Sequence, residues 1–360
     1  MRAFRFALLL MLVHWLVGCA DSRYYLQSVG GHLHMMQAAR PLKHWLADEA
    51  VAPALKQRLA LAQRIREFAV TDVGLPDNTS YRRFADLQRR AVVWNVVAAP
   101  EFSLELKTWC FPVTGCVGYR GYFSEADARA HAQTLREEGL EVSVYGVPAY
   151  STLGWLNWAG GDPLLNTFIH YPEGELGRMI FHELAHQVLY VQDDTVFNES
   201  FATAVERLGG ERWLAQQGGP AAQREYAEFD ARRRQLRALS ATTRARLTAL
   251  YAQPDLPGAD RVSLLAAKQQ VMKGFLADYE RLKMAWGGYS GYDGWVAGAN
   301  NAAFGAQAAY DELVPGFEAL FEREGQDWQR FYKAVRQLAT MPATERRRAL
   351  KHLSGDLTRG

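Results

Sequence analysis

Apolar residues recur every three or four positions over long parts of the chain, and this spacing predicts helices that each bury one face. The pattern covers residues 36–68, where Pro53 is expected to divide it into two helices. Residues 81–95 are a further helical candidate. After Gly209 the helical pattern continues almost to the end, interrupted by a glycine-rich segment at residues 287–298. The sequence therefore predicts a mostly helical protein.

Shorter runs between residues 102 and 147 have a different, β-like pattern. Residues 102–106, 117–123 and 141–147 are predicted strands, and residues 125–138 are predicted to be helical. Residues 20–35 show no sustained period and are expected to form a tether followed by a loop or short strand. The fold class that follows is α+β, predominantly α-helical, with a small sheet beside a helical body.

The N-terminus has the composition of an export signal. Arg2 and Arg5 precede a mostly apolar run, residues 6–17, that is too short to span a bilayer comfortably. The sequence Leu-Val-Gly-Cys that ends at Cys19 resembles a bacterial lipobox, in which cleavage before the cysteine leaves its sulfur to carry a lipid. We expect residues 1–18 to be a lipoprotein signal peptide. An ordinary signal peptide that contains a cysteine is the alternative.

A lipid on Cys19 implies a membrane-anchored protein of the bacterial cell envelope. General lipoprotein sorting favours the outer membrane, with the protein facing the periplasm. The mature chain would then comprise a tether at residues 19–35 and one domain at residues 36–360. That domain is expected to contain a helical part at 36–100, a sheet region at 101–160, two central helices at 173–209 and a helical lobe at 210–360.

Charge argues against nucleic acid as a partner. The chain has 41 Lys and Arg residues and 39 Asp and Glu residues. Loss of Arg2 and Arg5 with the signal peptide would balance the two totals, which leaves no excess of basic residues to neutralise phosphates.

Cys110 and Cys116 form a close pair that, in an exported protein, predicts a local disulfide. Paired metal ligands are the alternative, but no second pair exists to complete such a site.

The segment Phe181-His-Glu-Leu-Ala-His186 carries the chemistry of the chain. On a helix, His182 and His186 lie about 5 to 6 Å apart on one face and can bind one zinc ion. Glu183 lies one residue further round, where its carboxylate can take a proton from water at the metal and pass it to a leaving amine. The neighbouring residues are apolar nearly all round, which predicts a buried helix. A structural histidine pair is the alternative.

A catalytic zinc needs a third protein ligand and an open position. Glu199, thirteen residues after His186, is the best candidate, because residues 192–195 have the composition of a turn with helix-capping residues. A second helix can then return past the metal. Glu206, two turns further on the same face, and His170 are alternative ligands, and a solvated carboxylate is the alternative interpretation of Glu199.

At these residues the chain resembles a bacterial family of predicted aminopeptidase lipoproteins, zinc enzymes with an HExxH motif and a glutamate ligand. The shared segments are Cys-Phe-Pro-Val at Cys110, Gly-Tyr-Arg-Gly-Tyr-Phe ending at Phe123, Tyr-Ser-Thr-Leu-Gly-Trp ending at Trp155, the HExxH and Asn-Glu-Ser-Phe-Ala segments, and Asn-Asn-Ala at Asn300. The resemblance implies a zincin-like metallopeptidase fold with one Zn²⁺ per chain, and it favours Glu199 over Glu206. Many related enzymes have an acidic residue four positions after the ligand glutamate. This chain has Thr203 there, so the partner of the zinc histidines stays open.

Further site residues are proposed from their positions along the chain. Tyr150, Ser151, Thr152, Leu153 and Gly154 precede the catalytic helix, where related enzymes have the edge strand that pairs with the substrate; a core strand and turn is the alternative. Tyr289 and Tyr292, in the glycine-rich segment and supported by Asn300 and Asn301, are candidate donors to the developing oxyanion, although packing anchors are the alternative. Glu206, Glu173 and Asp162 are candidates for binding a substrate amine.

These observations predict a zinc-dependent peptidase. The preference for aminopeptidase over endopeptidase activity comes from the resemblance alone. An envelope binding or scaffold protein that keeps the metal site without turnover is the alternative, and Glu183 argues against it because metal binding alone would need only the ligands.

Overall fold

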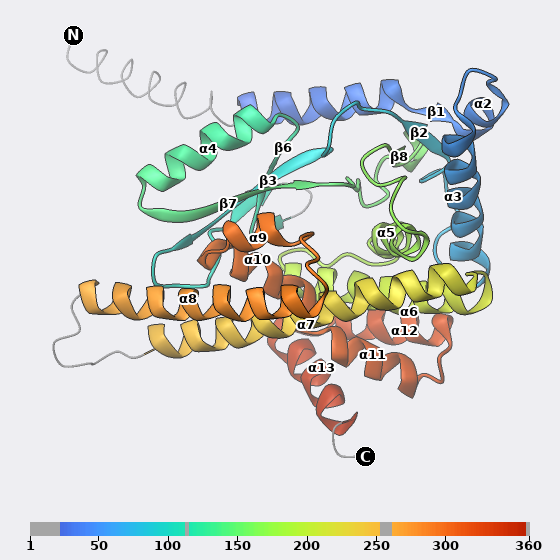
Figure 1. The fold of residues 1–360 in the computed structure, drawn as a ribbon. Coiled ribbons are helices and arrows are strands. Elements are labelled where there is room, and N and C mark those ends of the chain that lie inside the picture. Colours follow the sequence, from blue (N-terminus) through green and yellow to red (C-terminus); the bar gives the residue numbers. More distant parts are fainter. Residues whose placement is uncertain (1–21, 112–114, 253–260, 358–360) are drawn as a thin grey trace, which may run out of the picture.

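The computed structural model describes residues 22–111, 115–252 and 261–357. Two three-stranded sheets and a disulfide-bridged hairpin pack with a larger number of helices, so the described chain is predominantly helical with small sheets. Figure 1 shows the strands on one side of the molecule and the long C-terminal helices on the other. The α+β, mostly helical class predicted from the sequence is confirmed.

The larger antiparallel sheet has the order β6-β3-β7, formed by Arg120–Tyr122, Val93–Pro100 and Leu140–Val147. The other sheet has the order β1-β2-β8, formed by Arg40–Pro41, Arg83–Ala85 and Leu164–Leu165. Strands β4 (Trp109–Phe111) and β5 (Gly115–Val117) pair as a hairpin. A disulfide joins Cys110 to Cys116 across this hairpin, as the sequence predicts.

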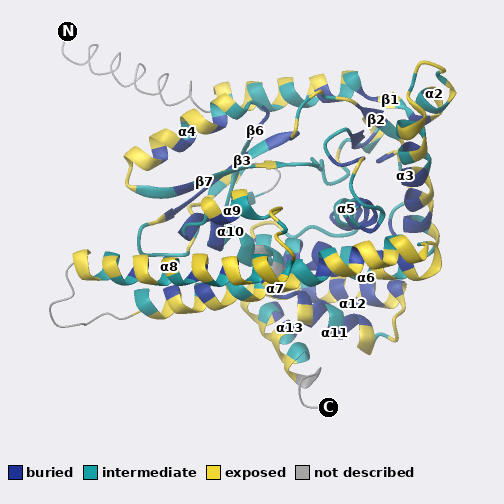
Figure 2. Cartoon of the chain, viewed as in Figure 1, coloured by how far each residue is buried: buried dark blue, intermediate teal, exposed yellow. Residues whose placement is uncertain are grey.

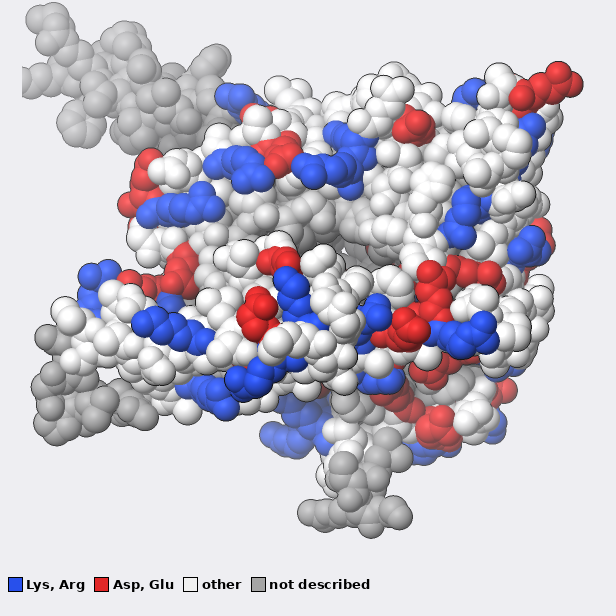
Figure 3. All heavy atoms as spheres, viewed as in Figure 1, with Lys and Arg blue, Asp and Glu red and all other residues white. Residues whose placement is uncertain are grey.

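The helices surround these sheets and carry most of the core. Their bounds are Leu42–Ala47 (α2), Pro53–Thr71 (α3), Glu125–Glu137 (α4), Asn157–Ala159 (the 3-10 helix η1), Glu173–Ala185 (α5), Thr195–Gln216 (α6), Pro220–Tyr251 (α7), Arg261–Ala285 (α8), Asp293–Ala297 (α9), Asn301–Asp311 (α10), Val314–Arg323 (α11), Trp328–Ala339 (α12) and Ala343–Leu357 (α13). Pro53 starts α3, which confirms the predicted division of residues 36–68. Figure 2 shows α5 largely buried, whereas α7 and α8 are exposed along one face. Figure 3 shows both basic and acidic side chains over this face.

The N-terminal part of the domain differs from the prediction. Residues 22–38 form a helix, so the expected tether at 19–35 is wrong for these residues. The helix packs because the ring of Tyr24 stacks on Phe111, 5.6 Å between centroids, and Gln27 hydrogen-bonds to the backbone of Phe123. Cys19 and the predicted signal peptide, residues 1–18, lie outside the described residues. None of the described helices is both long and apolar enough to cross a bilayer.

Two of the predicted boundaries in the sheet region are also corrected. Residues 81–95 contain β2 and the start of β3, so neither this helical candidate nor a helical part reaching residue 100 is correct. The reason is that Gln88 has a positive φ of 52° in the turn between them, and the β-branched run after it pairs with β7. Residues 102–106 form no strand, because Asn301 and Lys268 take the carbonyl of Glu101 by side-chain hydrogen bonds.

Candidate metal centre

Helix α5 presents its last turn to the interior. It starts after Pro172 with Glu173 and Glu175 in its first turn, where negative charge favours a helix N-terminus. Leu176, Ile180, Phe181 and Leu184 are fully buried, so the helix is fixed on most sides. His182 lies in the last turn, and His186 follows the helix end with helical backbone angles, φ −59° and ψ −22°. The two histidines therefore keep the helical spacing that the sequence predicts.

Helix α6 returns alongside α5 and brings the third candidate ligand. Asp194 caps it by accepting a hydrogen bond from the backbone N–H of Phe197, 3.3 Å, after the turn predicted at residues 192–195. Glu199 follows in the second turn. The side chains of Phe197 and Phe201 are fully buried, and α5 and α6 pack against each other. Glu199 is thereby held facing the histidines.

The three predicted ligands come together in the structure. One Glu199 carboxylate oxygen lies 3.4 Å from Nε2 of His182 and 3.8 Å from Nε2 of His186. The candidate ligand atoms of the three residues all lie within 4.8 Å of one another. The side chains of His182, His186 and Glu199 are 12%, 7% and 12% exposed, so the group is almost fully enclosed. It can hold a metal ion. His170 is exposed and is not part of this group.

The donor set and its spacing fit zinc. Two imidazole nitrogens and one carboxylate oxygen are a common ligand set of catalytic zinc sites. Bond lengths near 2.0 to 2.1 Å in a tetrahedral site place neighbouring ligand atoms about 3.4 Å apart, which is close to the separations measured here.

Glu206 lies on the other side of His182. Its carboxylate is 2.9 Å from Nδ1 of His182, the ring nitrogen away from Glu199, and it also pairs with Arg178. The structure therefore corrects the interpretation of Glu206 as an alternative ligand and gives the histidine partner that the sequence left open. The Arg178 side chain is 3% exposed and that of Glu206 is 15% exposed. Burial acts to raise the pKa of the Glu206 carboxyl, but Arg178 and His182 outweigh it and lower this pKa. Arg178 lies one turn before His182 in an otherwise apolar helix. A charged residue at such a buried position needs a partner, so the sequence does contain a signal for this ion pair.

The buried environment shifts the pKa values of the other site residues. Burial raises the pKa of Glu183 to about 7, with the neighbouring carboxylates adding to the effect of burial and His182 opposing it. Burial lowers the pKa of His186 to about 4. Burial also acts to lower the pKa of His182, but Glu199 and Glu206 outweigh it and raise this pKa well above its ordinary value. A glutamate with a pKa near neutrality is suited to both accepting and returning a proton.

A set of tyrosines not singled out in the sequence borders the ligands. The ring of Tyr310, on α10, stacks on His182 with 6.3 Å between centroids, and Tyr190 lies 6.4 Å from His186. Glu199, followed by burial, raises the pKa of Tyr310 well above its usual value, so this phenol stays protonated. The pKa of Tyr119 is also raised well above its usual value, mainly by burial and secondly by the charge of Glu199. No local motif marks Tyr310, because α10 reaches the site only through the fold.

Tyr289 and Tyr292 occupy a different environment. The guanidinium of Arg232 lies 4.6 Å from the centre of the Tyr289 ring, and Phe229 of α7 packs on the same ring. Tyr292 lines a cavity of about 340 Å³ with Tyr289 and the first turn of α5. Tyr289 and Tyr292 therefore have the contacts of packing anchors, which was the alternative interpretation of these residues. The tyrosine that stacks on a candidate ligand is Tyr310.

Asn300 and Asn301 fix α10 to the sheet. Asn300 caps the helix by accepting a hydrogen bond from Ala303 N–H at 3.0 Å, and its amide donates to the carbonyl of Val142 in β7 at 3.1 Å. Asn301 donates to the carbonyl of Pro100 at 3.0 Å, at the end of β3. Because α10 also packs on α6, these bonds set the position of Tyr310 relative to the ligands.

Residues 150–154 lie beside the site but form no edge strand. The Asp162 carboxylate accepts the backbone N–H of Thr152 at 3.1 Å, and Leu153 has a positive φ of 54°. Side chains therefore take the backbone donor that a strand would offer, which is why the edge strand expected here is absent. The amide of Gln187, the residue after His186, donates to Asp162 at 3.4 Å. This bond joins the segment to the end of the HExxH motif.

The three carboxylates considered for amine binding have other partners. Glu206 pairs with His182 and Arg178, as described above. Glu173 accepts a hydrogen bond from the indole N–H of Trp213 at 3.0 Å. Asp162, only 1% exposed, holds the 150–154 segment, and burial raises its pKa to about 6. Asp162 also interacts electrostatically with Glu183, so it is the one of the three that couples to both the segment and the general-base candidate.

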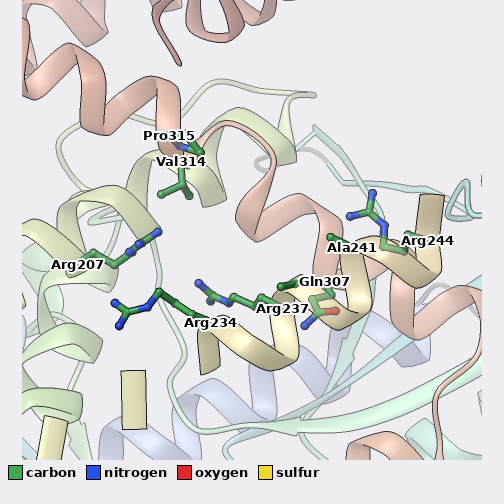
Figure 4. A pocket seen from close by; sticks show the side chains of 9 residues that line it. Arg207, Arg234, Arg237, Ala241, Arg244, Gln307, Val314 and Pro315 are labelled. Carbon is green, nitrogen blue, oxygen red and sulfur yellow. The ribbon is translucent and has the colours of Figure 1, made fainter. Parts of the chain in front are cut away.

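A second cavity, of about 360 Å³, lies between α6, α7, α10 and α11 and contains none of the candidate ligands. Figure 4 shows Arg207 from α6 and Arg234 and Arg237 from α7 extending into the space below Val314 and Pro315. Arg207 pairs with Glu318 at 3.2 Å, and Arg234 pairs with Asp230. Ion pairs within the fold thus account for two of these arginines.

One comparison with known proteins gives a match. The model of a family described as "Putative aminopeptidase" matches residues 23–350. No curated protein and no solved structure is significantly similar to the chain. The matched span includes the HExxH motif, Glu199, Glu206 and Tyr310.

Proposed function

The chain belongs to this aminopeptidase family, and from that premise we propose that it is a zinc-dependent aminopeptidase with a zincin-like fold. The observation that carries the proposal is the convergence of His182, His186 and Glu199 within 4.8 Å, with Glu183 adjacent on the same helix. A structural histidine pair would need no acidic neighbour with a pKa near 7. A retained metal site without turnover would not need Glu183 at all.

Each residue has a distinct part in the proposed reaction. His182, His186 and Glu199 would hold the metal, and Glu206 fixes the ring of His182. Zinc at these donors would polarise the substrate carbonyl and lower the pKa of water to about 7. Glu183 accepts the proton of the attacking water and returns it to the departing amine. Tyr310 donates a hydrogen bond to the oxygen on which negative charge develops. The 150–154 segment borders the substrate chain.

The proposal extends to the cell envelope. We propose that residues 1–18 are removed and that Cys19 carries the lipid, so that the enzyme is anchored to the outer membrane and faces the periplasm. The Cys110–Cys116 disulfide is consistent with an exported protein. Peptides that reach the periplasm are then the available substrates.

The first test compares peptides with free and N-acetylated amino termini. Zinc content and hydrolysis are measured for the parent protein, for Glu183→Gln, and for Glu228→Gln, an exposed glutamate on α7 that serves as the control. Zinc near one per chain, with cleavage of free-amine peptides that Glu183→Gln abolishes and Glu228→Gln keeps, is the expected result. Cleavage of both peptide sets would indicate an endopeptidase. A protein that neither binds zinc nor cleaves either set would refute the proposal.

A further inference from the structure

The helix formed by residues 22–38 carries apolar side chains on its outward face. Tyr25, Leu26, Val29 and Leu33 are 43%, 72%, 58% and 52% exposed. They lie within nine residues, and no other nine-residue stretch of the described chain exposes as many large hydrophobic side chains. Figure 2 shows the outer side of this helix exposed along its length. Exposed apolar groups in this density mark a contact surface.

The four side chains form one stripe. At 100° per residue, Tyr25, Val29, Leu33 and Leu26 fall within an arc of about 100° around the helix axis. The inward face is a different set. Tyr24 stacks on Phe111, Met35 is fully buried, and a side chain at Gly31 would overlap the ring of Phe123. The outward stripe is therefore not needed to hold the helix on the domain.

The position of the stripe along the chain selects its occupant. Cys19, the proposed lipid attachment site, is three residues before Ser22, where the described helix begins. Three residues reach at most about 11 Å even when fully extended. The start of the helix is thus within about 11 Å of a lipid-bearing residue. A stripe of this width close to an anchored residue fits the headgroup and acyl boundary of a bilayer.

We propose that the helix at residues 22–38 lies in the membrane interface, with Tyr25, Leu26, Val29 and Leu33 against the lipid. Arg23, at the start of the helix, lies 3.4 Å from the Asp127 carboxylate, but its side chain is 84% exposed and would also reach the lipid headgroups. The proposal rests on lipidation of Cys19 and is independent of peptidase activity. Where the sequence predicted a tether followed by a loop or short strand, a helix would then lie against the membrane.

Contacts of the helix extend this attachment to the candidate metal centre. The ring of His32 lies 5.9 Å from that of Tyr150, the first residue of the segment beside the site. Arg83 hydrogen-bonds to the carbonyls of Met36 and Ala39 and also lies against Gly160. Between the 150–154 segment and Gly160, the side chains of Trp155 and Trp158 are 67% and 85% exposed. Indole rings favour the bilayer interface. A helix fixed on the membrane would therefore set the orientation of the substrate segment toward the bilayer.

Lipid-borne quenchers test the proposal in the lipidated protein. Single cysteines at Val29→Cys and Leu33→Cys carry a fluorescent label, and Arg348→Cys, exposed on α13, is the control. The protein is reconstituted in vesicles of phosphatidylethanolamine and phosphatidylglycerol with nitroxide-bearing lipid. Quenching at positions 29 and 33, but not at 348, is expected. Equal, weak quenching at all three positions in membrane-bound protein would overturn the proposal.

A second measurement separates the helix from the lipid. The chain starting at Ala20, without the acyl groups, is sedimented with the same vesicles. The pair Val29→Asp and Leu33→Asp should weaken vesicle binding about tenfold or more, because two apolar side chains leave the lipid. Val262→Asp, a 71% exposed valine on α8, is the matched control and should leave binding unchanged. Equal binding of the parent and the double variant would refute the role of the stripe, whatever the peptidase assays give.

Discussion

Nδ1 of His182 lies 2.9 Å from the carboxylate of Glu206, whereas Nε2 of the same ring lies 3.4 Å from Glu199. One carboxylate therefore stands at each nitrogen of this imidazole. A carboxylate that accepts from the nitrogen away from a metal fixes the ring orientation and its tautomer. Arg178, only 3% exposed, holds Glu206 in turn. The chain Arg178–Glu206–His182 is thus a support for the metal ligand built from two adjacent helices.

Glu206→Gln is expected to lower zinc affinity by about 10-fold to 100-fold, because the histidine loses its charged partner. Zinc affinity is measured by competition with a chelating dye, and circular dichroism confirms that the variant is folded. Glu228→Gln should leave the affinity unchanged. A folded Glu206→Gln variant with the affinity of the parent would show that Glu206 serves only to pair Arg178.

Tyr310→Phe is expected to reduce kcat by about 10²-fold to 10³-fold, the range seen when an oxyanion donor is lost. The zinc affinity and KM should change little, since the ring that stacks on His182 is kept. Tyr289→Phe is the matched control, because Tyr289 packs on α7. If Tyr310→Phe retains the kcat of the parent, the donor is another group, and Tyr190 and Tyr119 become the next variants to assay.

The sequence predicts the parts of the site that are close along the chain. His182, Glu183 and His186 follow from helical spacing, and Glu199 follows because residues 192–195 give a short turn between two helices. Tyr310 is more than one hundred residues further on, and its position depends on the hydrogen bonds by which Asn300 and Asn301 hold α10 against the sheet. Such a contact has no local pattern.

Side-chain hydrogen bonds and two-sided apolar patterns explain the main errors. Residues 150–154 have strand-like composition, but Asp162 takes a backbone donor there. The helix at residues 22–38 has apolar side chains on both an inward and an outward face, so its sequence lacks the single stripe by which a helix is usually recognised. No part of the described domain covers its outward stripe, for which we propose the membrane interface.

Asp162 should give the protein a measurable pH dependence of stability. Its carboxyl is buried, which raises the pKa to about 6 from 3.8. The folded state therefore holds this proton more tightly than the unfolded state, so the contribution of Asp162 is most favourable below pH 4 and is lost as the pH rises to about 6. The shift corresponds to about 3 kcal/mol.

Asp162→Asn should remove this pH dependence. In chelator-treated protein, the free energy of unfolding of the variant, relative to that of the parent, should therefore increase between pH 4 and about pH 6. A constant difference between the two proteins would contradict the raised pKa.

The Cys110–Cys116 disulfide should stabilise the fold without contributing to the metal site. It closes a loop with a sequence separation of six residues, and a loop of this size restricts the unfolded chain by about 2 kcal/mol. The hairpin also contacts the turn between α5 and α6, where Asp193 accepts the backbone N–H of Cys116 at 2.6 Å. The double variant Cys110→Ser, Cys116→Ser should therefore unfold at lower denaturant concentration with its zinc affinity nearly unchanged.

A phosphine reductant should shift the unfolding of the parent to the same extent and leave that of the double variant unchanged. If the reductant leaves the parent unaffected, the disulfide does not form in the isolated protein; if zinc affinity falls together with stability, the hairpin also positions the turn that leads to Glu199.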